Sequence, residues 1–189
     1  MTGPGSQIAE SYIMLHAPLG DYGIAWGPNG LTRLQLPAAT TAATEERLAA
    51  SGRRRWSGRL PATVAQVVDE LGRYFSGTPT TFADVEVDFG ARPPIQLAIY
   101  AELRKVAWGE TVTYGDLAKA IGMPGAARLI GQTMGRNPVP VIVPCHRVLA
   151  SGNAIGGFSA PGGTSTKHRL LALERANAIE RLPLFAPRA

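Results

Sequence analysis

The chain has 189 residues, of which 45% are hydrophobic and 17% charged, so it can bury a core as one domain or two small ones. No stretch approaches the ~18 apolar residues of a membrane span, and residues 1–10 lack the basic and apolar regions of a secretory leader, so we expect a cytoplasmic protein without membrane contact. Its single cysteine excludes an internal disulfide and a multi-cysteine zinc site.

The net charge of +5 is unevenly distributed along the chain. Residues 1–89 carry seven Lys and Arg against nine Asp and Glu, whereas residues 90–189 carry twelve against five. A basic surface suits a polyanion, because Lys and Arg contacts to phosphates supply most of the non-specific affinity for DNA. Charge alone also allows a solvated basic face that serves only solubility.

The first half predicts a small sheet with helices. Turn sequences rich in Gly, Pro, Asn and Asp separate three short β-prone runs, which predicts an antiparallel meander over 12–17, 22–26 and 31–36. An alanine-rich segment, 38–51, is weakly helical, and a basic loop follows at 52–59. Apolar positions at helical spacing over 63–75 predict an amphipathic helix that covers the meander. We expect a further strand at 82–89 and a domain boundary near 90–94.

The second half predicts a pair of short helices. A helix that starts near Pro94 and ends before Gly109 comes first. Thr113 and Asp116 then resemble a capping box that opens a short helix. A glycine-bearing turn leads to a second short helix over about 125–135, which is the helix-turn-helix pattern.

The outer face of this second helix carries mostly small side chains and one long one. Its residues are Ala126, Ala127, Arg128 and Gly131. A helix that reads bases in the major groove would offer several polar side chains. The face therefore favours sequence-independent binding of double-stranded DNA from the minor groove, with Arg128 as a wedge. A helix pair that serves only packing is the alternative.

The only cysteine, Cys145, is followed directly by His146 in the sequence PCHRV. The surrounding prolines predict an extended segment, in which neighbouring side chains point to opposite sides, so a water would connect the two. A thiol needs a nearby base to ionise efficiently, and an acid behind the histidine would complete a relay. Of the two later acids, we favour Glu174, on a helix expected over 166–178, over Glu180. An inert buried cysteine and an ordinary surface glutamate are the alternatives.

Five motifs together resemble the O6-alkylguanine-DNA alkyltransferases, also called methylated-DNA–protein-cysteine methyltransferases. They are TYGDLA (113–118), AARLIG (126–131), RNPVPVIVPCHRV (136–148), GGFS (156–159) and LLALE (170–174). The resemblance implies an α/β fold with a ribonuclease-H-like antiparallel sheet and helices over 1–91. It further implies a mainly helical domain with the helix-turn-helix and the cysteine over 92–180, and a flexible tail over 181–189.

The resemblance also implies an activity and its partners. The protein would flip O6-alkylguanine out of duplex DNA and transfer the alkyl group to Cys145 in one irreversible event, with O4-alkylthymine as a minor substrate. It would act without a cofactor or metal, as a monomer bound to the minor groove; whether binding along DNA is cooperative stays open.

Each motif residue receives a role from the resemblance. His146 would act as the base through water, Glu174 would orient it, Tyr114 would donate a proton to guanine N3, and Asn137 would brace the turn before the cysteine. The pocket would be lined by Met134, Val148, Gly156, Phe158 and Ser159, and DNA would be contacted by Tyr114, Ala126, Ala127, Arg128, Gly131 and Arg136.

The chain departs from the family pattern in one loop. Phe158 stands where many relatives have tyrosine, and the loop over 158–164 is longer. Small residues, Gly156 and Ala160, predict an open pocket that accepts adducts larger than methyl.

Other classes of protein fit these residues less well. A non-reactive lesion binder would lack the cysteine. A cysteine hydrolase gives no role to Arg128 or the helix pair, and a transcription-regulating fusion would need several thiols for its metal domain.

Overall fold

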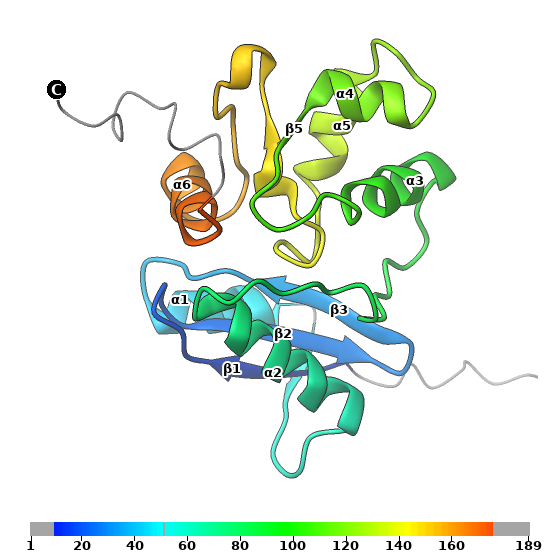
Figure 1. The fold of residues 1–189 in the computed structure, drawn as a ribbon. Coiled ribbons are helices and arrows are strands. Elements are labelled where there is room, and N and C mark those ends of the chain that lie inside the picture. The colour runs from blue at the N-terminus through cyan, green and yellow to red at the C-terminus, as the bar shows by residue number, and fades with distance from the viewer. Residues whose placement is uncertain (1–9, 51, 176–189) are drawn as a thin grey trace, which may run out of the picture.

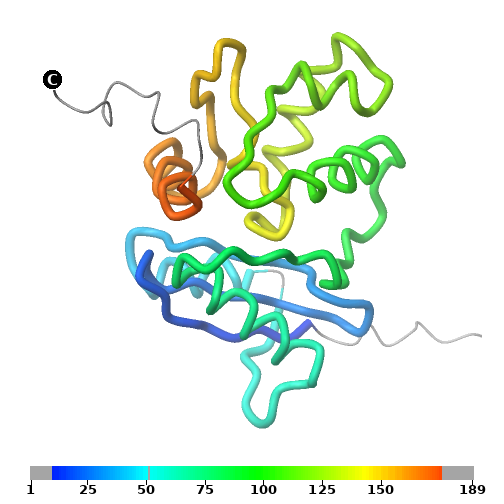
Figure 2. Tube along the Cα trace, in the orientation of Figure 1, coloured from blue at the N-terminus to red at the C-terminus, as the bar shows by residue number. Residues whose placement is uncertain are grey.

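The computed structural model describes residues 10–50 and 52–175, which form two parts packed against each other (Figures 1 and 2). Figure 1 shows the sheet with helices α1 and α2 in the lower part and helices α3 to α6 in the upper part. Among the described residues, no helix combines the length and the hydropathy that a membrane crossing requires.

The sheet is built from the predicted meander. Strands β1 (Ser11–Leu15), β2 (Tyr22–Gly27) and β3 (Gly30–Gln35) pair antiparallel in sequence order, which confirms the antiparallel sheet. A fourth strand, β4 (Arg54–Arg55), joins the other edge of β1 in parallel orientation, giving the order β3-β2-β1-β4. The sequence predicted only a loop there, because two exposed arginines carry no alternating pattern.

Successive side chains of a strand point to opposite faces of the sheet, so both faces of this sheet carry apolar side chains. One helix covers each face. Helix α1 (Thr41–Ala49) places Leu48 against Tyr12 and Ala25 on one face. Helix α2 (Ala62–Phe75) covers the other face, as predicted from its apolar spacing. The residues packed on that second face include Ile24, Trp26, Leu31, Val64, Val67 and Leu71.

The strand expected over 82–89 does not form. Only Val87 makes an isolated parallel bridge, to Leu31 at the sheet edge. Just before it, the Val85 amide donates to the Phe82 carbonyl at 3.2 Å. This local turn occupies the Val85 amide and the Phe82 carbonyl, which a strand would use to bond a neighbouring strand. Only Val87 therefore pairs with the sheet.

The upper part contains the predicted helix pair. Helix α3 (Pro94–Leu103) leads to β5 (Val112–Thr113), α4 (Tyr114–Ala120) and α5 (Ala127–Met134). The capping box is present: Asp116 N donates to Thr113 Oγ1 at 3.1 Å, and Thr113 N donates to Asp116 Oδ2 at 3.3 Å. These contacts fix the start of α4 at the expected residue.

The remaining elements follow the cysteine. They are the short 3₁₀ turns η1 (Cys145–Arg147) and η2 (Ser151–Asn153), strand β6 (Val148–Leu149) and helix α6 (Gly163–Leu173). Helix α6 starts three residues before the predicted 166 and ends at Leu173, whereas the predicted end at 178 lies outside the described residues.

One hydrophobic core runs through both parts of the molecule. At the junction, the Leu34 amide of β3 donates to the Pro138 carbonyl at 2.9 Å. The ring of Tyr74, near the end of α2, lies 5.1 Å from the ring of Trp108 in the upper part. The predicted domain limits at residues 91 and 180 stay predictions, and the predicted tail over 181–189 lies outside the described residues.

Candidate active site

Cys145 lies at the start of the 3₁₀ turn η1, where the sequence predicted an extended segment. The turn closes because Arg147 N donates to the Pro144 carbonyl at 2.9 Å, and the parallel pairing of Val112 with Val148 anchors the chain just after it. Before it, Val141 adopts a φ of 77°, a left-handed conformation that is unfavourable for a β-branched residue. The thiol is thus held in a tightly constrained segment, with Cys145 only 6% exposed.

Asn137 braces this segment through three hydrogen bonds. Its Nδ2 donates to the Val143 carbonyl at 2.8 Å and to Cys145 Sγ at 3.2 Å, and its Oδ1 accepts from Val139 N at 3.1 Å. The structure therefore brings together the asparagine and the cysteine that lie eight residues apart in the motif.

The surroundings of the thiol have opposing effects on its ionisation. Burial raises the pKa of Cys145, while the Asn137 amide and the charge of Lys167 oppose that rise. Because burial is the larger effect, the thiol stays protonated near neutral pH and needs a base to become a good nucleophile.

His146 and Glu174 form a buried pair. The His146 Nε2 lies 2.7 Å from Glu174 Oε1, and neither side chain is exposed. Arg147 donates from Nε to Oε2 and from Nη2 to Oε1 of the same carboxylate, each at 2.9 Å. Although burial opposes ionisation of Glu174, His146 and Arg147 outweigh it and hold the pKa of that carboxyl well below its usual range.

This pairing determines which nitrogen of the imidazole can act as a base. Burial lowers the pKa of His146 although Glu174 raises it, so the ring is neutral near pH 7. The ionised carboxylate takes the Nε2–H as a donor. Nδ1 is buried and has no hydrogen-bond partner among the described residues, so its lone pair is available for a proton.

Tyr74 was not recognised as a site residue from the sequence. Its hydroxyl donates to Glu174 Oε1 at 2.6 Å and lies 3.3 Å from His146 Nε2. Burial, with the Glu174 charge next, raises the pKa of Tyr74 well above its usual value, so the hydroxyl keeps its proton. The helical spacing of α2 identified position 74 only as apolar. A buried tyrosine hydroxyl requires a hydrogen-bond partner, and this requirement could have indicated a polar contact at Tyr74.

Lys167 is a second buried group that sequence reasoning missed. Its Nζ donates to the Val148 carbonyl at 2.6 Å, and its side chain is not exposed. Burial lowers the pKa of Lys167 to about 8. In the sequence, the position of Lys167 gave no indication that its side chain points into the core.

The titration of Lys167 should appear in the stability of the protein. Because its pKa is about 8 when folded and near 10.5 when unfolded, the unfolded chain binds more protons between these values. The free energy of unfolding of the wild type, relative to Lys167→Met, should therefore rise from pH 8 to pH 10.5, by ~3 kcal/mol at most. Urea unfolding across this range checks it. Lys105→Met, at an exposed lysine, is the control for the substitution itself, and a flat difference for Lys167→Met would contradict the prediction.

The helix pair and the residues next to it carry most of the other predicted site residues. Tyr114 begins α4, half-buried, and burial raises the pKa of its hydroxyl. Its ring lies against Gly131 of α5 and Gly156, at 3.8 and 3.9 Å from an idealised Cβ on each glycine. On the outer side of α5 and just beyond it, Ala127, Arg128 and Arg136 are exposed, whereas Ala126 is half-buried.

A cavity of about 240 Å³ opens beside the thiol. Of the predicted pocket residues, it brings Met134, Phe158 and Ser159 together with Cys145 and Asn137. Val148 and Gly156 do not line it: Val148 is fully buried and Gly156 lies against Tyr114.

The fold combines a pair of short helices joined by a turn with a buried thiol, next to a buried histidine–glutamate pair. A family model described as "6-O-methylguanine DNA methyltransferase, DNA binding domain" matches residues 94–176. The methylated-DNA–protein-cysteine methyltransferase of Mycobacterium tuberculosis is 35% identical over 174 residues, which cover 92% of this chain and 98% of that protein. The chain therefore belongs to the methylated-DNA–protein-cysteine methyltransferase family, and the resemblance seen in its motifs is confirmed.

Solved structures agree with this assignment. The crystal structure of M. tuberculosis O6-methylguanine methyltransferase has a TM-score of 0.71 and 33% identity, covering 92% of this chain and 95% of that chain. The M. tuberculosis OGT structure in complex with DNA has a TM-score of 0.70 and 32% identity, covering 90% and 97%. These matches extend over both parts of the molecule, so the predicted two-part α/β fold is confirmed.

Proposed function

We propose that this protein repairs duplex DNA by transferring the alkyl group of O6-alkylguanine to Cys145, once per chain. One observation carries the proposal: a buried thiol, held by Asn137, lies at a cavity next to a neutral histidine whose Nδ1 is free to accept a proton. Methyl and larger groups on O6 are the substrates, and O4-alkylthymine is a minor one.

The proposed reaction forms a carbon–sulfur bond and breaks the carbon–oxygen bond at guanine O6. The Cys145 proton passes through a bridging water to His146 Nδ1, while Glu174 stabilises the resulting imidazolium. The electron pair of the broken bond goes to the guanine, where a proton from Tyr114 to N3 neutralises it. The product is a thioether, which does not exchange with thiols, so each chain reacts once.

The helix pair supplies the route to the lesion. An alkyl group on guanine cannot reach the thiol inside the base stack, so the nucleotide must be flipped out. Ala126, just before α5, and Ala127 and Gly131 on α5 are small, which allows close approach to the minor groove, independent of sequence. Arg128 fills the space left in the stack, and Arg136 contacts the backbone. A cytoplasmic monomer without cofactor suffices for this chemistry.

Mass spectrometry of the intact protein tests the proposal. After incubation with a duplex containing O6-methylguanine, the protein should gain one methyl group and no more, and the guanine should be restored. Cys145→Ala should gain nothing. Repeated turnover, or methyl gain in Cys145→Ala, would contradict the proposal and favour a different use of the thiol.

The hydroxyl of Tyr74 should tune the base. In Tyr74→Phe, Glu174 Oε1 loses a donor at 2.6 Å, so its charge acts more strongly on His146 and raises the pKa of that imidazole. The acid limb of the transfer rate should therefore move to higher pH, and the plateau rate should fall by less than about tenfold.

A matched control separates this effect from a loss of packing. Tyr12 is also buried and donates to a carboxylate, Glu45, at 3.1 Å, but it lies on the α1 face of the sheet. Tyr12→Phe should leave the pH profile unchanged. A Tyr74→Phe profile that is lowered equally at every pH would mean that the hydroxyl serves only stability.

A further inference from the structure

The cavity beside Cys145 is bordered by four arginines. Arg33 comes from β3, Arg47 from α1, Arg92 from the segment before α3, and Arg136 from the segment after α5. They therefore come from four separate stretches of the chain, two of them in helices or strands and two in connecting segments. Among the described residues that line this cavity there is no Asp or Glu.

These four guanidinium groups form no ion pair with any described acid. Arg33 Nη2 donates only to the Gln35 amide oxygen, at 3.2 Å, and its Nε is buried without an acceptor among the described residues. Arg92 Nε donates to the Phe89 carbonyl at 2.9 Å. Burial, and then the charges of Arg53 and Arg47, lower the pKa of Arg33.

Two other arginines that are not exposed have an acid as partner, whereas Arg104 donates to backbone carbonyls. Arg53, near Arg33, is bound to Glu10, and Arg147 is bound to Glu174. Of the four arginines at the cavity, Arg33 and Arg92 are half-buried, whereas Arg47 and Arg136 are exposed. A half-buried cation without a counter-charge is unfavourable, so the unpaired Arg33 at this cavity indicates a site for an anion. Arginine suits a carboxylate well, because its planar fork can donate two parallel hydrogen bonds.

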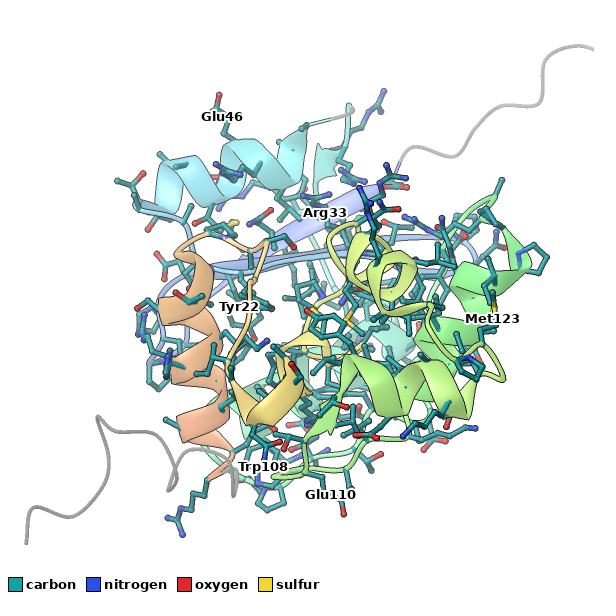
Figure 3. All side chains as sticks on the ribbon, turned by 90° about the horizontal axis from the view of Figure 1, so that it is seen from above. Tyr22, Arg33, Glu46, Trp108, Glu110 and Met123 are labelled. Carbon is teal, nitrogen blue, oxygen red and sulfur yellow. The ribbon has the colours of Figure 1, made fainter. Side chains whose placement is uncertain are left out.

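Arg33 and Arg47 lie apart from the DNA surface proposed above, whereas Arg136 belongs to both that surface and the cavity. Arg33 and Arg47 belong to the sheet part, which Figure 1 shows below the helix pair. Figure 3 labels Arg33, which lies beside the segment that follows α5. Cys145 and the four arginines line the same cavity, which has room for a group attached to the reacting carbon.

We propose that this cavity is a carboxylate subsite, and that the protein prefers O6-carboxyalkylguanine over neutral adducts of equal size. The inference rests on the proposed function and names its substrate class. The sulfur bonds to the methylene carbon, the bond from that carbon to O6 breaks, and the carboxylate stays ionised throughout. Cys145 then carries the carboxyalkyl group.

Two isosteric adducts test the proposal in single-turnover experiments. One duplex carries O6-carboxymethylguanine and the other its neutral amide, O6-carbamoylmethylguanine. Because the two adducts also differ in intrinsic reactivity, the informative quantity is the ratio of their rates in each variant, relative to the wild type. Arg33→Gln should lower this ratio at least fivefold, and the double variant with Arg47→Gln should lower it further.

Two further variants make the test specific. Arg33→Lys keeps the charge and should retain part of the preference. Arg59→Gln removes an exposed arginine that does not line the cavity, and it should leave the ratio unchanged. Thermal melting of each variant shows that the comparison is made between folded proteins.

The alternatives give distinct results. If the ratio in Arg33→Gln and in the double variant equals that of the wild type, there is no carboxylate subsite. If both rates fall together with the affinity for undamaged duplex, the arginines contact backbone phosphates, which also overturns the inference. If no variant, nor the wild type, reacts with O6-methylguanine DNA, the proposed function itself has failed.

Discussion

The single substitution Glu174→Gln should both destabilise the fold and almost abolish alkyl transfer. The carboxylate accepts hydrogen bonds from Tyr74, His146 and Arg147, all of them buried. Glutamine fills the same space but leaves the Arg147 guanidinium without a counter-charge. Breaking a buried pair from one side costs about 3–5 kcal/mol, which urea unfolding should detect.

The catalytic effect of Glu174→Gln has a separate cause. Without the carboxylate, nothing fixes the tautomer of His146 or stabilises its protonated form, so the transfer rate should fall by ~10²–10⁴. Quenched single-turnover assays, run at a temperature where the variant is folded, measure this fall. Glu46→Gln is the control, because Glu46 is exposed on α1. A rate within threefold of the wild type would show that His146 does not depend on Glu174.

Asn137→Ala should weaken both the turn and the nucleophile. The substitution leaves the Val139 amide without its acceptor, at about 1–3 kcal/mol, whereas the Val143 carbonyl loses one donor and keeps the Cys145 amide at 2.8 Å. It also removes the donor to Cys145 Sγ, so the pKa of the thiol should rise and transfer should slow by about tenfold.

Ionisation of the thiol can be measured without DNA for this variant. The rate of Cys145 alkylation by iodoacetamide as a function of pH gives the midpoint directly, and Asn137→Ala should shift it upward. Asn29→Ala removes an exposed amide that donates to Asp88 at 3.3 Å, and it should shift neither the midpoint nor the stability. An unchanged midpoint in Asn137→Ala would mean that the 3.2 Å contact does not affect the thiol.

Local sequence patterns predicted most of the fold. The meander, α2 and the capping box at Thr113 depend on residues close together in the chain, where turn chemistry and periodicity act directly. The 3₁₀ turn at Cys145 was predicted as extended because prolines dominate its sequence. Its shape depends instead on Asn137, whose side chain bonds to Val143 across the turn.

The candidate site was only partly predictable. Cys145, His146 and Asn137 lie within one motif, and Glu174 was one of two acids that follow the cysteine. Tyr74 lies 100 residues before Glu174, and its role depends on how the two parts of the molecule pack. The four arginines of the cavity are likewise scattered over more than a hundred residues, so no spacing rule brings them together.

The hydrogen bonds of Glu174 join residues from α2, η1 and the end of α6. During synthesis on the ribosome, Cys145 and His146 leave the exit tunnel before Glu174 does, when the base has no acceptor behind it. A nascent chain therefore carries a thiol that is not yet activated. Under the proposed mechanism, the one transfer that each molecule can perform becomes possible only after translation has passed α6.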